Sequence, residues 1–430
     1  MTFSFMKRNL KVGVIGLWHL GSVYAASLAR MGIDVVCFDY DKKVLADFKK
    51  NIPPIFEPGL KEALKKYKKK LYFTAEIKKT FSNTDYIFVT FDLPVDEKDE
   101  VDLGLIRKTF PLIVKYIQPQ TTVIVSSQVP LGTCRLLVES LKKKRKHNRV
   151  VYFPENLRLG DAFSSFLSPD RIILGCDDQN IGRKFKADFK FKCPVIAMKL
   201  ESAEMVKHAL NTYLATCISY SSELSDLCER LGANMQEVVQ ALKSDSRVSP
   251  KAPLNPGLGF AGGTLGRDLR SVQKLGQSIN YKTKLVNAIY EVNKDRLPYL
   301  INKVKNNLRT LKGKKICILG LTYKPNTDTL RRSMSLELSS RLAKEKVTIN
   351  AYDPFINKNI SRYSYINIFS SPEKAAQNCD AIIIMTEHSE FKNINPKKLL
   401  LKGKTIFDTK NFLDKSAYEK AGFIVNNTGA

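Results

Sequence analysis

The chain has 430 residues, of which 43% are hydrophobic and 26% are charged, a composition typical of folded globular proteins rather than of disordered ones. The length predicts two or three domains, and no apolar run reaches the roughly 18 residues that a membrane-spanning helix needs. The N-terminal residues run directly into a strand pattern without the cleavage-type segment of a signal peptide, so we expect a cytoplasmic protein.

The formal net charge is +28, and basic residues are concentrated at 65–70 and 141–149. A charge of this size makes nucleic acid the first partner to consider. Both runs fall where helices should expose a solvated face, however, so we expect an anionic small ligand rather than a nucleic acid. The eight cysteines are scattered, without CxxC spacing or a histidine cluster, which argues against a disulfide framework and predicts no metal site.

The N-terminal part of the chain alternates strand and helix patterns. Residues 10–17 form an apolar strand pattern that leads through a glycine turn into the helix pattern of residues 21–32. The next strand pattern, residues 33–41, contains Asp39, and an acid about 20 residues after such a turn is typical of a dinucleotide-binding βαβ unit. Further apolar strands are predicted at residues 86–91, 121–127 and 149–154. We therefore expect a doubly wound α/β domain here.

The middle of the chain follows a helical period instead. Residues 201–242 show a long helical pattern in which Gly232 is a candidate C-cap, and one more helix is predicted over about 282–308. A long helix with one apolar stripe often supplies a dimer interface. This segment is therefore interpreted as a helical spacer that pairs two copies of the chain.

A second α/β unit begins at residues 314–325. It continues with strand patterns at 347–354, 381–387 and 404–411. The predicted fold class is α/β, with two Rossmann-like doubly wound domains joined by a central α-helical domain.

The first glycine turn, "GLWHLG", departs from the usual dinucleotide-binding motif. Gly16 and Gly21 occupy its first and last positions, but Trp18 replaces the middle glycine. That glycine normally lets the backbone approach the diphosphate of the cofactor, which lies on the helix N-terminus. An indole at this position requires a shifted diphosphate or an altered loop, so a Rossmann-like scaffold that binds no dinucleotide is the alternative.

Eight short stretches, taken together and in order, carry a more specific signal. They are IFEPGL (55–60), VPLGT (129–133), PENLRLG (154–160), AEMVKHALN (203–211), GLGFAGGT (257–264), GLTYKPNTDTLRRS (320–333), AYDP (351–354) and FDTKN (407–411). Over residues 10–415 the sequence resembles the UDP-glucose/GDP-mannose dehydrogenases, NAD-dependent enzymes that oxidise the C6 alcohol of a nucleotide sugar to an acid. The resemblance implies a homodimer with an NAD-binding domain (1–198), a helical dimerisation domain (199–308) and a nucleotide-sugar-binding domain (309–430).

The resemblance also implies a set of catalytic residues. Lys207 and Asn211 lie four positions apart on one predicted helix, so they share a face, and they would steady the alkoxide that forms as hydride leaves. Asp268 would accept the proton together with an ordered water. Glu155 would position water or relay protons in the second half-reaction. Thr264 occupies the position of the nucleophile.

Further residues are implied to bind the two ligands. The cofactor site for NAD would consist of Gly16, Trp18, Leu20, Gly21, Asp39, Gln128 and Arg331. The site for a UDP-sugar would consist of Arg247, Phe260, Gly262, Gly263 and Lys324. The glycines of this loop let the backbone fold closely over a sugar, because glycine accepts backbone angles that side chains forbid. Arg247 and Lys324 would supply the positive charge that grips the nucleotide.

The sequence departs from the family at the nucleophile. The resemblance implies a cysteine at the position that Thr264 occupies here. In the family, the thiol of that cysteine adds to the C6 aldehyde, and a second NAD then oxidises the adduct to a thioester. A free thiol has a pKa of about 8.5, whereas the alcohol of a threonine is far less acidic. Gln128 and Leu93 also replace threonines that the family resemblance implies. Sugar recognition is thus predicted to be kept while the redox chemistry is altered.

We therefore expect NAD-dependent oxidation of a UDP-hexose at C6, which stops at the aldehyde because the cysteine is missing. Three alternatives stay open. A spatially adjacent thiol such as Cys217 could replace it, or the aldehyde hydrate could be oxidised without a covalent intermediate. The third is a homologue that binds or senses a nucleotide sugar without redox chemistry.

Overall fold

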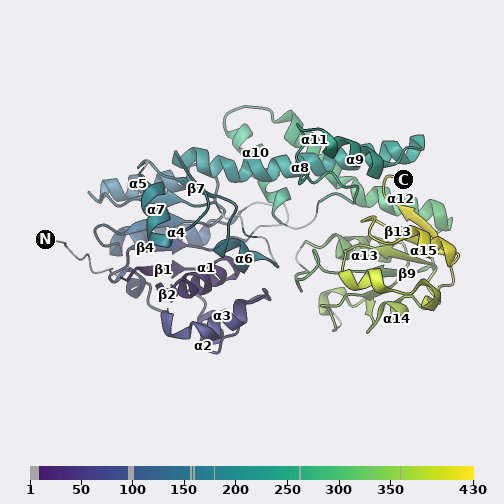
Figure 1. The fold of residues 1–430 in the computed structure, drawn as a ribbon, viewed down its shortest axis with the longest axis horizontal. Coiled ribbons are helices and arrows are strands. Elements are labelled where there is room, and N and C mark those ends of the chain that lie inside the picture. The colour runs from purple at the N-terminus through teal and green to yellow at the C-terminus, as the bar shows by residue number, and fades with distance from the viewer. Residues whose placement is uncertain are drawn as a thin grey trace. The chain divides into compact units, whose positions relative to one another are not determined.

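The computed structural model describes residues 9–94, 101–154, 157, 160–178, 180–260, 263–330, 332–358 and 360–430. The chain divides into two compact units, residues 1–209 and 210–430, which are described separately (Figure 1). Within the described residues, none of the helices combines the length and the apolar character that crossing a membrane requires.

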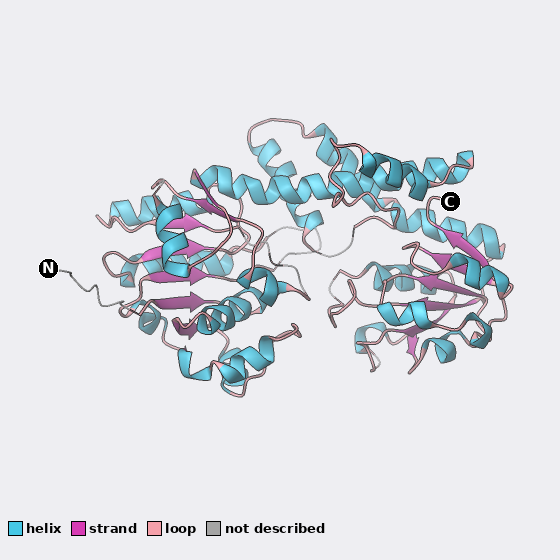
Figure 2. Ribbon diagram, in the orientation of Figure 1, coloured by secondary structure: helices cyan, strands magenta, loops and turns pink. Residues whose placement is uncertain are grey.

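The first unit is built on an eight-stranded sheet of order β3-β2-β1-β4-β5-β6-β7-β8. Its strands are β1 (Lys11–Ile15), β2 (Asp34–Phe38), β3 (Leu71–Thr74), β4 (Tyr86–Val89), β5 (Thr122–Val125), β6 (Val150–Tyr152), β7 (Ile172–Gly175) and β8 (Val195–Met198). Neighbouring strands are parallel except β6 and β7. The central strands β4 and β5 are fully buried and mostly apolar, because helices cover both faces of the sheet (Figure 2).

Two groups of helices make the two cores of this unit. One core packs α1 (His19–Arg30), α2 (Lys42–Lys49), α3 (Leu60–Lys66), α6 (Ala162–Leu167) and α7 (Ile181–Phe189) on the sheet. The other packs α4 (Gly104–Tyr116), α5 (Thr133–Lys143) and the first residues of α8 (Leu200–Leu231). Two 3₁₀ turns, η1 (Lys68–Lys70) and η2 (Ile77–Phe81), lie between β2 and β4. The expectation of a doubly wound α/β fold is confirmed.

The second unit begins with helices. They are the rest of α8, α9 (Met235–Ser244), α10 (Leu265–Ser278), α11 (Lys284–Lys294) and α12 (Arg296–Leu308). Helix α8 ends because Gly232 turns left-handed, with φ +74°, and the N–H of Ala233 donates to the carbonyl of Cys228 at 3.0 Å. The prediction of one helix over 282–308 is wrong. Pro298 has no N–H for the carbonyl of Lys294, so the helical hydrogen bonding is interrupted there.

The C-terminal sheet has six parallel strands in the order β11-β10-β9-β12-β13-β14. The strands are β9 (Lys315–Leu319), β10 (Thr348–Tyr352), β11 (Ile366–Ile368), β12 (Ala381–Ile384), β13 (Thr405–Asp408) and β14 (Ile424–Asn427). Helices α12 and α13 (Met334–Lys344) pack on one face, and α14 (Pro372–Ala376) and α15 (Lys415–Lys420) on the other. The 3₁₀ turns are η3 (Ser361–Tyr363), η4 (Ser389–Asn393) and η5 (Pro396–Lys398). The second Rossmann-like fold is confirmed, while the boundaries of the three domains stay a prediction.

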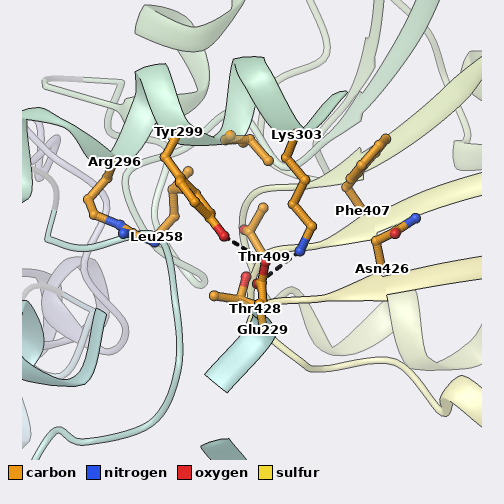
Figure 3. A pocket seen from close by; sticks show the side chains of 10 residues that line it. Glu229, Leu258, Arg296, Tyr299, Lys303, Phe407, Thr409, Asn426 and Thr428 are labelled. Carbon is orange, nitrogen blue, oxygen red and sulfur yellow. Dashed lines mark hydrogen bonds and ion pairs between the residues drawn. The ribbon is translucent and has the colours of Figure 1, made fainter. Parts of the chain in front are cut away.

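A half-buried polar network ties the C-terminal residues to the helices of the second unit. Glu229 on α8 accepts hydrogen bonds from the Tyr299 hydroxyl at 2.6 Å, from Lys303 Nζ at 2.9 Å and from the N–H of Gly429 at 2.7 Å. Tyr299 and Lys303 point from α12 toward this carboxylate (Figure 3). The cavity beside them measures about 10 Å³, room for one water, and is therefore far too small for a nucleotide sugar.

Candidate functional site

The glycine turn of the first unit keeps the geometry of a dinucleotide-binding loop. Gly16 follows β1 with φ +95°, a conformation that side chains disfavour. A Cβ on Gly21 would lie 1.7 Å from the carbonyl oxygen of Gly16, so only glycine lets α1 pack this closely on the turn. The Thr90 hydroxyl donates to the same carbonyl at 2.8 Å. Gly16 thus allows the tight turn after β1, and Gly21 allows the close packing of α1, as the dinucleotide-binding motif requires.

Asp39 lies directly after β2, where this fold places the acid that binds a ribose. Its Oδ2 accepts the N–H of Leu17 at 2.6 Å, and its Oδ1 accepts the N–H of Asp41 at 2.9 Å. The carboxylate therefore braces the glycine turn from the neighbouring strand. Each oxygen still has a lone pair that a ribose hydroxyl could use.

A second acid, which the sequence analysis missed, lies at the start of α1. The Asp92 carboxylate accepts the N–H of Leu20 at 3.0 Å. Trp18, the residue before α1, has a side chain that is 46% exposed. In the sequence, Asp92 is marked only by its position three residues after the apolar run of β4. Ligands bind in this fold at the carboxyl ends of the parallel strands.

Glu204 is a further residue that the pattern did not reveal. It lies on α8 three residues before Lys207, is fully buried, and accepts the N–H groups of Gly132 and Cys134 at 2.6 and 2.9 Å. Burial raises the pKa of Glu204, and the two backbone donors offset part of that effect. The carboxylate thereby joins α8 to the N-terminus of α5, which follows the loop that carries the buried Gln128.

The second unit brings together two of the predicted catalytic residues. Asn211 on α8 and Asp268 in the first turn of α10 are both buried, and the Asn211 amide donates to the Asp268 carboxylate. Thr264 is the N-cap residue of α10, and the N–H of Asp268 donates to its carbonyl at 3.1 Å. Because they are four residues apart, Thr264 and Asp268 lie on one side of the helix. A carboxylate held in this way can serve as a proton acceptor.

The glycine-rich loop is held by a residue that sequence reasoning missed. Asn293, near the end of α11, accepts the N–H of Phe260 at 2.8 Å and donates to the carbonyl of Phe260 at 3.2 Å. Gly259, just before, has φ +78°, and a Cβ there would lie 2.4 Å from Asn293 Oδ1. The side-chain amide of Asn293 thus holds the loop through the backbone of Phe260, and it lies so close to residue 259 that only glycine fits there.

Cys217, the alternative thiol, packs with Met235 in the cluster of α8 and α9. Phe260 of the glycine-rich loop packs with Ala215 in a different cluster, against which Leu265 also packs. Within the described residues, no cysteine belongs to the cluster around the glycine-rich loop.

The remaining predicted residues are spread over both units. Lys207 is buried on α8, four residues before Asn211. Arg247 lies in the turn after α9, exposed and paired with Asp245 at 2.7 Å. Gly263 is half-buried just before Thr264, and so is Lys324 in the turn after β9. Three predicted residues lie outside the described residues: Glu155, Gly262 and Arg331.

Comparison with known proteins gives the same family at every level. Of the UDP-glucose/GDP-mannose dehydrogenase family, the NAD-binding domain matches residues 10–190, the central domain matches 201–295 and the UDP-binding domain matches 317–415. UDP-glucose 6-dehydrogenase of Rickettsia typhi is 32% identical over 429 residues, which covers 96% of this chain and 98% of that protein. UDP-glucose 6-dehydrogenase TuaD of Bacillus subtilis is 30% identical, covering 97% of this chain and 93% of its own length.

Solved structures agree in fold. A UDP-glucose dehydrogenase from the archaeon Pyrobaculum islandicum superimposes with a TM-score of 0.89 and 26% identity, over 100% of both chains. The UDP-N-acetyl-mannosamine dehydrogenase Cap5O from Staphylococcus aureus has a TM-score of 0.81 at 23% identity, covering 97% of this chain and 98% of its own, and shows the shared fold alone.

Proposed function

The chain belongs to the UDP-glucose/GDP-mannose dehydrogenase family, and from that premise we propose that it oxidises a UDP-hexose at C6 and stops at the aldehyde. As a member of the family it is an NAD-dependent nucleotide-sugar dehydrogenase. The observation that carries the finer proposal is the buried Asn211–Asp268 pair, in which the N–H of Asp268 also donates to the carbonyl of Thr264, at the position where the family resemblance implies a cysteine.

The first unit supplies the residues that would hold NAD. The close packing of Gly21 on Gly16 lets the N-terminus of α1 approach the turn where the diphosphate of the cofactor would bind. Asp39 lies where a ribose is bound in this fold. Gln128, Trp18, Leu20 and Arg331 are proposed to complete the site. When bound, NAD accepts a hydride.

The second unit supplies the proton acceptor. As hydride leaves C6, the hydroxyl proton passes through a water to the Asp268 carboxylate, and a carbonyl forms. Asn211 keeps that carboxylate oriented through its amide. Lys207, four residues earlier on α8, is proposed to stabilise the negative charge that develops on the C6 oxygen.

The reaction would stop there because a second oxidation needs a nucleophile on the carbonyl. The aldehyde still carries one hydrogen on C6, but that hydrogen can leave as hydride only after a thiol or a water has added to the carbonyl. Thr264 has a hydroxyl, and its alcohol is far less acidic than a thiol with a pKa near 8.5. Addition of water with Glu155 or Asp268 as the base is the route by which the acid would still form.

The sugar nucleotide is proposed to lie under the glycine-rich loop. Phe260, Gly262 and Gly263 would close over the hexose, because the Asn293 clamp fixes the start of this segment. Arg247 and Lys324 would meet the negative charge of the diphosphate.

We further propose that the protein is a homodimer through α8. Tyr213, Tyr220, Leu227 and Leu231 follow one another at intervals of seven, seven and four residues and are 56%, 50%, 47% and 80% exposed. Residues at this spacing lie on one face of a helix, and an apolar stripe of this kind is expected to pack against a second copy. Leu227→Lys should therefore shift the protein to monomer in sedimentation experiments.

The function is tested by incubating the protein with NAD and a panel of UDP- and GDP-sugars while following NADH. We expect NADH with a UDP-hexose, and a loss of turnover of about 10²-fold or more in Asp268→Asn. Asp414→Asn, which changes an acid that caps α15 in the same unit, should keep its turnover. Binding of UDP-sugars without NADH from any of them would contradict the proposal and favour the non-redox alternative.

A further inference from the structure

The N-terminus of α1, where a Rossmann-like fold binds an anionic ligand, is already in contact with the carboxylate of Asp92. In Rossmann-like folds the diphosphate of the cofactor lies on the N–H groups at this end of the first helix, because they are unpaired donors and carry partial positive charge. Here the N–H of Leu20 already donates to the half-buried Asp92 carboxylate at 3.0 Å. A carboxylate and a phosphate are acceptors of the same kind, so they compete for the same donor.

We propose that Asp92 sets the cofactor affinity of this enzyme, because its carboxylate must leave the Leu20 N–H before the diphosphate of NAD can bind there. The inference concerns the cofactor step of the proposed function and depends on that function being NAD-dependent. Two effects act in the same direction. The hydrogen bond to Leu20 is broken on binding, and two groups of negative charge are brought together in a half-buried place where water screens them poorly.

Two further N–H groups close to Leu20 also donate within the protein. The N–H of Leu17 donates to Asp39 at 2.6 Å, and the N–H of Ser22 donates to the carbonyl of Trp18 at 3.0 Å. Leu20 lies between them in the sequence, at the start of α1, so its N–H is one of the donors that a ligand at this turn would use. The acid that occupies it comes from 72 residues further along the chain, after β4, and is not part of the glycine motif.

The chain carries its own probe for this binding step. Trp18 is its single tryptophan, lies in the glycine turn and is 46% exposed. Its fluorescence should change when NAD binds beside it, so that affinity can be measured in the absence of sugar and of turnover. Calorimetry provides an independent dissociation constant.

The test compares wild-type protein with Asp92→Asn and Asp92→Ser. Asparagine keeps an oxygen within reach of the Leu20 N–H but removes the charge, whereas the shorter serine removes the charge and withdraws from that N–H. We expect the dissociation constant for NAD to fall at least tenfold in both. Asp34→Asn is the matched control, because Asp34 is the first residue of β2 and thus lies at the amino ends of the parallel strands, whereas Asp92 follows the carboxyl end of β4. Asp34 is paired with Lys70 at 2.9 Å. The control variant should change the constant less than twofold.

The outcomes separate this inference from the proposed function. If wild-type protein binds NAD and neither Asp92 variant binds it more tightly, the role of Asp92 is refuted while the dehydrogenase stands. The same holds if Asp34→Asn gains as much affinity as the Asp92 variants, because the effect is then one of net charge. If neither wild type nor variants bind NAD, both the inference and the NAD-dependent function fail. The serine variant keeps the test valid if the asparagine variant does not fold.

Discussion

Replacing Asn293 by alanine should loosen the glycine-rich loop by a predictable amount. The change removes two hydrogen bonds to the backbone of Phe260, at 2.8 and 3.2 Å, and leaves an N–H and a carbonyl that must find water. Each such bond contributes about 0.5–1.5 kcal/mol net, so the variant should lose about 1–3 kcal/mol. For a unit the size of residues 210–430, 1 kcal/mol corresponds to about 2–4 °C, so the melting temperature should fall by about 2–12 °C.

Thermal unfolding and calorimetry with a UDP-sugar are the assays. The Asn293→Ala variant should also bind the sugar more weakly, because its loop is less ordered before binding and the cost of ordering it reduces the affinity. Asn307→Ala is the control, because Asn307 lies exposed on α12 and its amide donates to the carbonyl of Lys303 within the same helix, at 2.9 Å. An Asn293→Ala protein that melts and binds sugar like Asn307→Ala would refute the role of this clamp.

Three further predictions follow from particular contacts. Gly259→Ala should destabilise by about 1–3 kcal/mol more than Gly232→Ala, because both positions have positive φ but only a Cβ at Gly259 meets another atom, 2.4 Å away; equal losses in melting temperature would contradict this. Glu204→Gln should alter the pH dependence of stability. Burial raises the folded-state pKa of Glu204 above its ordinary value of 4.5, so the native state holds the proton more tightly and this stabilisation is lost as pH rises through the folded pKa. The stability of wild type relative to the variant should therefore decline with pH above 4.5 in thermal melts, and a rising difference would be inconsistent with it. Thr264→Cys should increase the NADH formed per sugar consumed toward two; an unchanged ratio would show that residue 264 does not face the reacting carbon.

The sequence was most informative where strands are buried on both faces. β1, β4 and β12 were predicted because they are continuous apolar runs, which is the pattern of central parallel strands. β3, β8, β11 and β14 were missed, because each is a short edge strand whose side chains are partly exposed and therefore follow no clear apolar pattern. β7 was missed as well, although all four of its residues are buried. The break between α11 and α12 was signalled by a proline, but the long helical period concealed it.

The same distinction holds for the candidate site. Gly16, Gly21 and Asp39 could be predicted because they belong to one local motif. Asp92 and Asn293 could not, because each acts on a backbone group 72 or 33 residues away, and only the folded chain brings those groups together. Their residue types are common on surfaces, so neither stands out before its partner is known.

The central claim is that this chain takes a nucleotide sugar only to the aldehyde. The direct measurement is the number of NADH molecules formed per UDP-hexose consumed at completion, with the product trapped by hydroxylamine and identified by mass spectrometry. One NADH and an oxime of the C6 aldehyde are expected. Two NADH and a uronic acid that hydroxylamine does not trap would contradict the account.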